Sequence, residues 1–355
     1  MGAIIRGIGV YYPENVVTNA QLEKKVDTTD EWITTRTGIK QRRILPNDSN
    51  LLASDFGAAA AQAAMTKAGI KPEDIDGIIC ANINPDKQFP ATACFIQAKI
   101  GAKNAFAFDV TAACAGFVFA ANMASLLIDS GQAKNILVIG AEILSRVLDW
   151  TDRNTCILFG DAAGAVVFSA GPKDRGILLS QLKSDGTQAD VLFLNSLMGH
   201  GKGFPADEVD EIDEDDDDDD YEDDEDGDED ENEEPDQEAA PAMNMDGKQV
   251  FKAAVTEIAD IVKSTVAKAG FTMQDLDLLV MHQANVRIIN AIADKLGLPP
   301  EKVIINVDKF GNTSSASIPL ALFDAESQGR LQPGKLVALA AVGGGMSWGC
   351  NLMRW

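Results

Sequence analysis

The stretch Asp109-Val-Thr-Ala-Ala-Cys114-Ala-Gly-Phe117 joins two apolar segments of different character. The run 105–110 predicts a buried strand, and the small and apolar residues of 116–128 predict a helix. Cys114 therefore lies in the first turn of that helix. Unpaired N–H groups and the helix dipole stabilise a thiolate there, so we expect a pKa below the usual value of about 8.5. The thiolate is the nucleophilic form and suits acyl transfer, although a packed core cysteine is the alternative for this residue taken alone.

The same order of elements occurs twice in the chain. Each half has an amphipathic helix, a turn with an acidic pair and a β-rich strand, followed by a further helix and strand. The matching segments are 51–68, 71–81 and 135–141 in the first half and 247–269, 273–281 and 335–341 in the second. Strands that alternate with helices predict parallel sheets covered on both faces. We therefore expect two related α/β halves, 1–172 and 173–355.

Composition indicates a large folded protein of a reducing compartment. The chain has 355 residues, of which 46% are hydrophobic, so it can bury a large core. Its five cysteines form no Cys-x-x-Cys pair and are too few for a disulfide scaffold. No apolar run reaches the roughly 18 residues of a membrane span, and residues 1–6 lack the order of a signal peptide. We expect a cytoplasmic protein without a membrane or nucleic-acid partner.

The net charge of −25 comes from one segment. Residues 207–238 carry 25 Asp and Glu and no Lys or Arg, and the rest of the chain has 30 acidic and 30 basic residues. Such a tract has too few apolar residues to fold alone, so we interpret about 207–240 as a disordered insert in the second half. Within it, 222–233 nearly matches a calcium-binding loop. A near match arises easily in so acidic a tract, and no amphipathic helices flank it.

His282 and Asn312 add two further side chains at strand-to-helix turns. His282 follows an apolar strand, and ligands gather at such strand ends. Asn312 lies in Phe310-Gly-Asn312-Thr-Ser, before a helix predicted at 318–326. Taken alone, His282 is either a structural histidine or a site residue, and Asn312 is most simply a turn residue. The other histidine, His200, lies in a flexible polar turn before the insert.

Together, the thiol, the imidazole and the carboxamide suit thioester chemistry. A thiolate attacks a thioester carbonyl, and the other two groups donate hydrogen bonds to an enolate oxygen where water is excluded. No Cys/His cluster has the spacing of metal ligands, so we expect no metal. The triplet Gly343-Gly-Gly345 follows a predicted strand and lets backbone N–H groups approach a ligand closely. It fits an oxyanion hole better than a phosphate loop, since no Lys-Ser/Thr follows it.

Five motifs resemble the β-ketoacyl-acyl-carrier-protein synthase III family. They are Thr28-Thr-Asp-Glu-Trp32-Ile-Thr-Thr-Arg36, Thr111-Ala-Ala-Cys114-Ala-Gly116, His282-Gln-Ala-Asn-Val-Arg287, Gly311-Asn312-Thr-Ser314 and Gly343-Gly-Gly-Met-Ser-Trp-Gly349. The likeness runs along the whole chain and is broken only by the acidic insert. It implies an α/β thiolase-like fold, with two related halves stacked as a five-layer αβαβα sandwich. It also implies a homodimer with Cys114, His282 and Asn312 as the catalytic triad.

The resemblance further implies the substrates and their contacts. An acyl-coenzyme A acylates Cys114, and malonyl on acyl carrier protein is then decarboxylated and condensed with the acyl group. The implied site residues are Cys114 and Gly344 for the oxyanion hole; Trp32, Arg36, Arg153, Gly247 and Ala284 for coenzyme A; Arg287 for carrier docking; and Leu144, Phe159, Val342 and Phe89 for the acyl pocket, with Phe89 reaching across the dimer. No cofactor is implied, because the coenzyme A thioester is a substrate.

Two features depart from the family pattern. Val342 and Met346 stand where the family often has aromatic residues, which leaves the chain length of the acyl donor open. The acidic insert interrupts a segment that in the family lies near the mouth of the active site. We interpret it either as a passive solubilising loop or as a tethered competitor for the basic patch that docks acidic carrier proteins.

Individual residues bear on four alternative functions. A degradative thiolase needs a second cysteine near the glycine turn, but the chain has Met346 there and Cys350 deeper in the next strand. A hydroxymethylglutaryl-coenzyme A synthase-like enzyme needs a glutamate near Cys114, and folding would have to bring Glu142 close. A condensing enzyme of secondary metabolism would keep the same triad. A non-catalytic carrier-binding scaffold would not need all three side chains.

Overall fold

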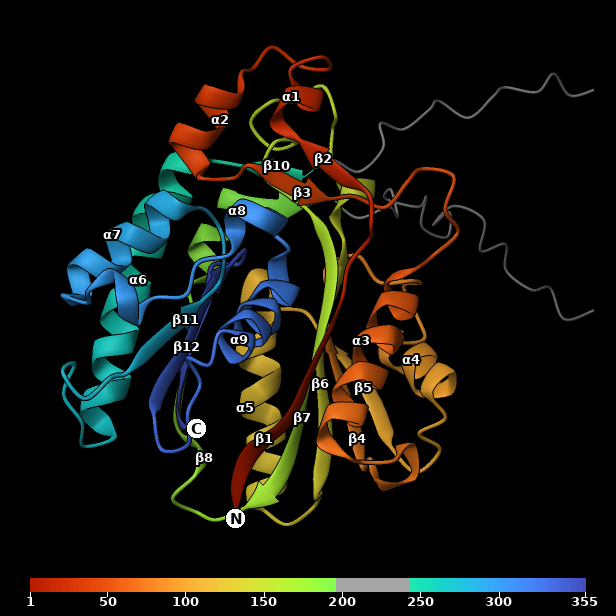
Figure 1. Ribbon diagram of the computed structural model, residues 1–355, viewed down its shortest axis with the longest axis vertical. Coiled ribbons are helices and arrows are strands. Elements are labelled where there is room, and N and C mark those ends of the chain that lie inside the picture. The colour runs from red at the N-terminus through yellow and green to blue at the C-terminus, as the bar shows by residue number, and fades with distance from the viewer. Residues whose placement is uncertain (196–242) are drawn as a thin grey trace, which may run out of the picture.

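Each half of the chain contributes one main sheet (Figure 1). The computed structural model describes residues 1–195 and 243–355. The first sheet has the order β1-β7-β6-β4-β5, with β1 (Gly2–Tyr11), β4 (Gly77–Ala81), β5 (Phe106–Val110), β6 (Asn135–Ile143) and β7 (Asp161–Gly171). The second has the order β11-β12-β13-β8, with β8 (Gly176–Ser184), β11 (Leu278–Met281), β12 (Leu336–Gly343) and β13 (Ser347–Arg354).

Helices form three layers around these sheets. α3 (Ala53–Ala68) and α4 (Thr92–Ile100) cover the outer face of the first sheet, and α6 (Gly247–Lys268) and α7 (Val286–Leu296) cover the outer face of the second. α5 (Gly116–Asp129) and α9 (Ser317–Ser327) pack between the sheets and share one core with both. The result is the five-layer αβαβα sandwich that the sequence predicted.

Shorter elements complete the described chain. They are β2 (Val16–Thr18), α1 (Asn19–Leu22), α2 (Asp30–Thr37), β3 (Gln41–Arg43), β9 (Leu192–Leu194), β10 (Met243–Met245) and α8 (Val307–Phe310), with 3₁₀ turns at η1 (Pro72–Asp74), η2 (Ala113–Ala115), η3 (Leu144–Val147), η4 (Gly186–Val191), η5 (Pro300–Lys302) and η6 (Ser314–Ala316). β9 and β10 pair with each other, as do β2 and β3.

Close packing in the layers depends on small residues and on burial. α5 lies in the central layer, so it is apolar on most sides, and Phe117, Val118 and Ile128 are fully buried. On the outer face of the first sheet, a Cβ at Gly9 of β1 would lie 2.2 Å from the Ala60 carbonyl oxygen of α3. Glycine there allows the helix and the strand to approach closely.

The predicted helices are present, but three predictions about strands are wrong in whole or in part. β5 was expected to be buried, but it is partly exposed because it lies at the edge of its sheet. Asn312 follows helix α8 rather than a strand. The prediction that the sheets are parallel is wrong in part. β4 is parallel to β5 and β6, and β11 is parallel to β12. β7 is antiparallel to β1 and β6, and β13 is antiparallel to β12 and β8. The short glycine turn between β12 and β13 contains no helix, and such a connection permits only antiparallel pairing.

The remaining predictions from the sequence concern membrane spans, His200 and the acidic tract. None of the described helices is long and apolar enough to span a membrane. His200 and the acidic tract, with its calcium-loop-like stretch, lie outside the described residues.

Candidate active site

Two similar turns carry the predicted nucleophile and the predicted carboxamide. Cys114 lies in η2, between β5 and α5, and Asn312 lies just before η6, which leads into α9. In both turns the first residue of the 3₁₀ segment has a left-handed backbone, with φ of 46° at Ala113 and 47° at Ser314. Non-glycine residues adopt this region at an energetic cost, and such strain concentrates at functional sites. The two halves of the chain thus build matching strained turns that face the same cavity.

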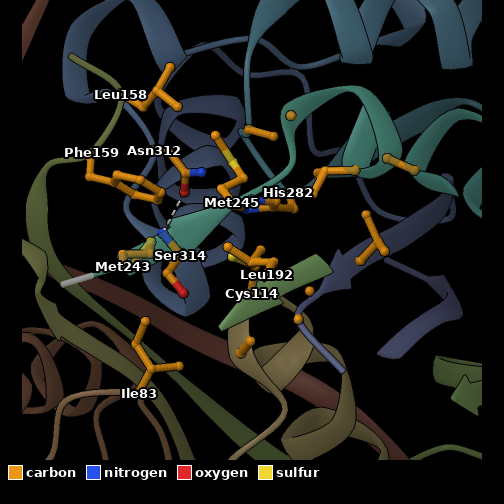
Figure 2. A pocket seen from close by; sticks show the side chains of 18 of the residues that line it. Ile83, Cys114, Leu158, Phe159, Leu192, Met243, Met245, His282, Asn312 and Ser314 are labelled. Carbon is orange, nitrogen blue, oxygen red and sulfur yellow. Dashed lines mark hydrogen bonds between the residues drawn. The ribbon is translucent and has the colours of Figure 1, made fainter. Parts of the chain in front are cut away.

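The structure brings the three predicted catalytic side chains together. Cys114, His282 and Asn312 line one cavity, seen in Figure 2, with Ser314 beside them. The rest of the wall is mostly apolar and comes from both halves and from the β9–β10 pair. Its members include Ile83, Leu158, Phe159, Leu192, Phe193, Leu194, Met243, Met245, Ile288, Val342 and Met346. A cavity with this lining excludes water around a few polar groups, as a thioester site requires.

His282 is a neutral imidazole held in one orientation. It follows β11, is buried, and its Nδ1 lies 2.7 Å from the Ser317 hydroxyl of α9. Burial lowers the pKa of His282 to about 4. If Ser317 donates to Nδ1, the proton sits on Nε2 and points away from Ser317. With Ser317 donating to Nδ1, the ring donates a hydrogen bond from Nε2; with Nδ1–H donating to Ser317, Nε2 is instead free to accept a proton.

Asn312 presents its amide donors to the cavity. Its Oδ1 accepts a hydrogen bond of 2.9 Å from the Ser314 N–H, drawn as a dashed line in Figure 2. Its backbone is held by the N–H of Gly160 and the carbonyl of Leu158, at 3.0 and 2.8 Å. With the oxygen engaged, the Nδ2 group is the end left to donate to a ligand. Asn312 is therefore more than a turn residue.

The predicted low pKa of Cys114 is wrong for the unliganded site. The thiol is buried, and burial raises its pKa to about 11; the neighbouring Ser314 hydroxyl offsets part of the rise, and the charge of Glu142 adds to it. Desolvation outweighs the helix N-terminus because the thiol is buried in a mostly apolar cavity lined by both halves of the chain. The resting pair is therefore a protonated thiol and a neutral imidazole, and thiolate forms by proton transfer within the cavity.

The glycine turn lies directly against the nucleophile. A Cβ at Gly343 would lie 2.6 Å from the backbone nitrogen of Cys114 and 2.9 Å from that of Ala115. Gly343 and Gly344 both line the cavity, and paired backbone bonds between Met346 and Asp185 hold the end of the turn. The turn leads into strand β13 rather than a helix, so it lacks the helix N-terminus of a phosphate loop. Its place beside the Cys114 N–H fits an oxyanion hole.

The residues implied for coenzyme A lie at the entrance. The guanidinium groups of Arg36 and Arg153 lie 4.7 and 5.2 Å from the ring centroid of Trp32. Gly247 and Ala284 line the cavity itself. An adjoining cleft shares Gly247 and Asn285 with the cavity and is further lined by Arg36, Lys248, Phe251 and Arg287. The entrance is therefore cationic, whereas the interior is apolar.

Two implied pocket residues lie elsewhere in the single chain. Phe159 and Val342 line the cavity as implied, but Leu144 does not. Leu144 is fully buried and packs in the same cluster as Phe159, behind the wall. Phe89 is 82% exposed and lines no part of the cavity. Leu144 acts on the pocket only through its neighbours, because the 3₁₀ turn after β6 points it into the core.

Sequence reasoning missed several residues of the site. Ser314 and Ser317 contact the triad, and the serine-rich run 314–317 was the available signal. Glu142 was named from the sequence only as a residue that folding could bring close to Cys114, and it does influence the Cys114 pKa, although it does not line the cavity. Cys350 is buried in β13 and also does not line the cavity, so the second cysteine of a degradative thiolase is missing from the described site.

The sandwich fold and the thiol, imidazole and carboxamide of its cavity define a condensing enzyme of the thiolase class. Models of the 3-oxoacyl-[acyl-carrier-protein] synthase III family and of its C-terminal part match residues 108–186 and 266–355. The chain is 46% identical over 364 residues to the β-ketoacyl-[acyl-carrier-protein] synthase III of Agrobacterium fabrum, which covers 99% of both chains. The chain belongs to the β-ketoacyl-acyl-carrier-protein synthase III family, and it is an acyltransferase of the initiation of fatty-acid synthesis.

Solved structures agree with this assignment. The synthase III of Aquifex aeolicus superposes with a TM-score of 0.85 at 41% identity, covering 100% of both chains. That of Pseudomonas aeruginosa has a TM-score of 0.85 at 37% identity, covering 100% of this chain and 98% of the other. A priming β-ketosynthase of the R1128 polyketide pathway has a TM-score of 0.84 at 31% identity, covering 99% and 96%. The identity is therefore higher to these two synthases than to the polyketide enzyme.

Proposed function

We propose that Cys114 accepts an acyl group from an acyl-coenzyme A and passes it to malonyl carried on acyl carrier protein. The observation that carries this proposal is the convergence of Cys114, His282 and Asn312 in one apolar cavity that adjoins a cationic cleft. The names of the relatives support the carrier protein as the second substrate. A non-catalytic scaffold would have no need of this convergence.

The first half-reaction forms an acyl-cysteine. The Cys114 thiol loses its proton to Nε2 of His282, in the neutral tautomer that carries its proton on Nδ1, as the sulfur attacks the thioester carbonyl. The N–H groups of Cys114 and Gly344 hold the oxyanion. When the tetrahedral intermediate collapses, the carbon–sulfur bond to coenzyme A breaks, and the leaving thiolate takes the proton back from His282. The products are acyl-Cys114 and free coenzyme A.

The second half-reaction forms the new carbon–carbon bond. The malonyl group loses carbon dioxide, and the electron pair of the broken bond becomes an enolate. Its oxygen accepts hydrogen bonds from the imidazole of His282 and the Nδ2 group of Asn312. The enolate carbon attacks the acyl-Cys114 carbonyl, and the carbon–sulfur bond breaks. The products are a β-ketoacyl carrier protein and the Cys114 thiolate, which takes one proton from solvent to restore the thiol. The reaction needs no cofactor beyond the coenzyme A thioester consumed in the first half.

The entrance residues support both substrates. The half-buried indole of Trp32 suits the adenine of coenzyme A, and Arg36 and Arg153 beside it suit phosphate. Arg287 and Lys248 in the adjoining cleft supply positive charge for an acidic carrier protein. The five cysteines are all free, which supports a reducing cytoplasm as the location.

Acylation by a panel of acyl-coenzyme A thioesters tests the donor. We expect a mass increase of one acyl group on the intact protein for a subset of chain lengths. Trp32→Ala should raise the half-saturating donor concentration about fivefold, since an aromatic contact contributes roughly 1 kcal/mol. Trp32→Phe, which keeps an aromatic face, should stay near the wild type. If no coenzyme A thioester acylates the protein, the donor is carrier-bound and the assignment of Trp32 is wrong.

A second copy of the chain is expected to complete the pocket. β5 is an edge strand, and Phe106, Met123 and Leu126 beside it are 40%, 37% and 60% exposed. An unpaired edge with apolar flanks favours pairing with another strand. Light scattering should therefore give about twice the chain mass of 37.8 kDa. Leu126→Glu should lower that mass, whereas Leu52→Glu, at 39% exposure on another face, should not. A wild-type monomer would contradict the dimer and the role of Phe89.

A further inference from the structure

Glu142 is a buried acid that the reaction above does not use. It lies near the end of β6 with none of its surface exposed, and no ion pair among the described residues involves it. Its Oε2 accepts a hydrogen bond of 3.2 Å from the Ile83 N–H, next to β4. Its Oε1 lies 2.6 Å from the Ser315 hydroxyl, in the η6 turn that follows Asn312. Glu142 thus joins the Asn312 turn of the second half to the sheet of the first.

The contacts of Ser315 show which form of Glu142 fits. The Ser315 hydroxyl also lies 2.9 Å from the Ala81 carbonyl oxygen, which can only accept. One hydroxyl proton cannot make two strong bonds. Both contacts are satisfied when Ser315 donates to Ala81 and a protonated Glu142 donates to Ser315. A buried carboxylate without a cation nearby is costly, which also favours the neutral form.

Among the described residues, the thiols of Cys114 and Cys80 interact with the charge of Glu142, and Asp109 and Asp86 act on the same Cys80 thiol. A negative charge on Glu142 disfavours the thiolate forms of Cys114 and Cys80, so it raises the pKa values of both thiols. Burial raises the pKa of Glu142 itself to about 7, against partial offsets from Ser315, Ile83 and Ser314. Glu142 therefore ionises near neutral pH, and its negative charge then opposes thiolate formation at Cys114.

We propose that Glu142 is a positioning residue that is protonated in the active enzyme, ties the Asn312 turn to the Cys114 side of the cavity, and suppresses the reactivity of Cys114 when it ionises. The proposal rests on the proposed function only in taking Cys114 as the nucleophile. It adds an alkaline limit on thiol reactivity that the triad alone does not predict.

The test is the rate of Cys114 alkylation by iodoacetamide as a function of pH, read by mass spectrometry. Alkylation needs neither acyl donor nor carrier protein, so its outcome is independent of the substrate assignment. Glu142→Gln keeps an acceptor for Ile83 and a donor for Ser315, and it cannot ionise. We expect its alkylation rate at pH 8 to be about 3- to 10-fold above the wild type, with the two curves converging below pH 6.

One control variant and one further measurement make the result decisive. Asp161→Asn makes the same change at another buried acid, one that contacts Leu45 and Ser145, and it should leave the Cys114 profile unchanged. The wild-type profile decides the matter if Glu142→Gln does not fold. An isolated thiol of high pKa should alkylate about tenfold faster for each pH unit, and ionisation of Glu142 should flatten that rise between pH 6 and 8. A Glu142→Gln rate at pH 8 equal to or below the wild type, or a wild-type rise that does not flatten, would overturn the proposal.

Discussion

Replacement of Cys114 by alanine will abolish acylation and condensation while leaving malonyl decarboxylation in place. The sulfur is the only atom that bonds to the acyl group, so its loss should lower condensation at least about 10³-fold. His282 and Asn312 are held by Ser317 and Ser314 rather than by Cys114. They remain able to stabilise an enolate. The measurements are the intact mass after acyl-coenzyme A and carbon dioxide release from malonyl carrier protein.

A matched thiol variant completes that experiment. Cys94 is partly exposed, whereas Cys80, Cys156 and Cys350 are buried and line no part of the cavity. Cys94→Ala should therefore acylate like the wild type. An acyl adduct that persists in Cys114→Ala and disappears in Cys94→Ala would show that the nucleophile has been assigned to the wrong cysteine. Loss of decarboxylation in Cys114→Ala would show instead that the thiol takes part in both half-reactions.

Replacement of Gly343 by alanine will inactivate the enzyme without touching any catalytic side chain. The added methyl would lie 2.6 Å from the Cys114 nitrogen and 3.0 Å from the Ala112 carbonyl oxygen, both backbone atoms that cannot rotate away. The two turns must therefore separate, which displaces the oxyanion N–H groups. We expect a 10²- to 10³-fold loss of acylation rate, typical of a lost oxyanion donor, and a loss of about 1–3 kcal/mol in the free energy of unfolding.

Gly186→Ala is the matched control for that variant. A Cβ at Gly186 meets no atom within 4 Å, so the substitution should change the free energy of unfolding by no more than about 0.5 kcal/mol. Urea denaturation and the acylation rate measure both effects. A Gly343→Ala protein that acylates at the wild-type rate would mean that the glycine turn does not form the oxyanion hole.

The high pKa of Cys114 and the low pKa of His282 have one cause, which is burial. Burial disfavours every charged form, so the resting site holds no ion pair between thiolate and imidazolium. A substrate carbonyl and the N–H groups of the oxyanion hole then supply the stabilisation that water does not. The site is thus poised to form charge only when an acyl donor is bound.

The sequence by itself determined the elements and the chemistry of the site. Local periodicity predicts α3, α5 and α6, and the breaks at Cys114 and His282 mark strand ends, where ligands gather, whereas Asn312 follows the short helix α8. The residue types at those breaks indicate thioester chemistry, because side-chain chemistry is a property of the residue and needs no coordinates. The direction of β7, β8 and β13 was not predictable in this way, since strand pairing depends on contacts that are distant in sequence.

Only the tertiary structure decided how the site behaves. The pKa of Cys114 rises instead of falling because helices and strands from both halves remove its water, and a local motif carries no information on desolvation. Leu144 lies behind the pocket wall because the turn after β6 points it into the core. Glu142 meets Ser315 across 173 residues of chain. Burial, side-chain direction and long-range contacts arise from packing the whole chain. The sequence motifs therefore indicate which groups react, and the fold determines their protonation states and which residues they contact.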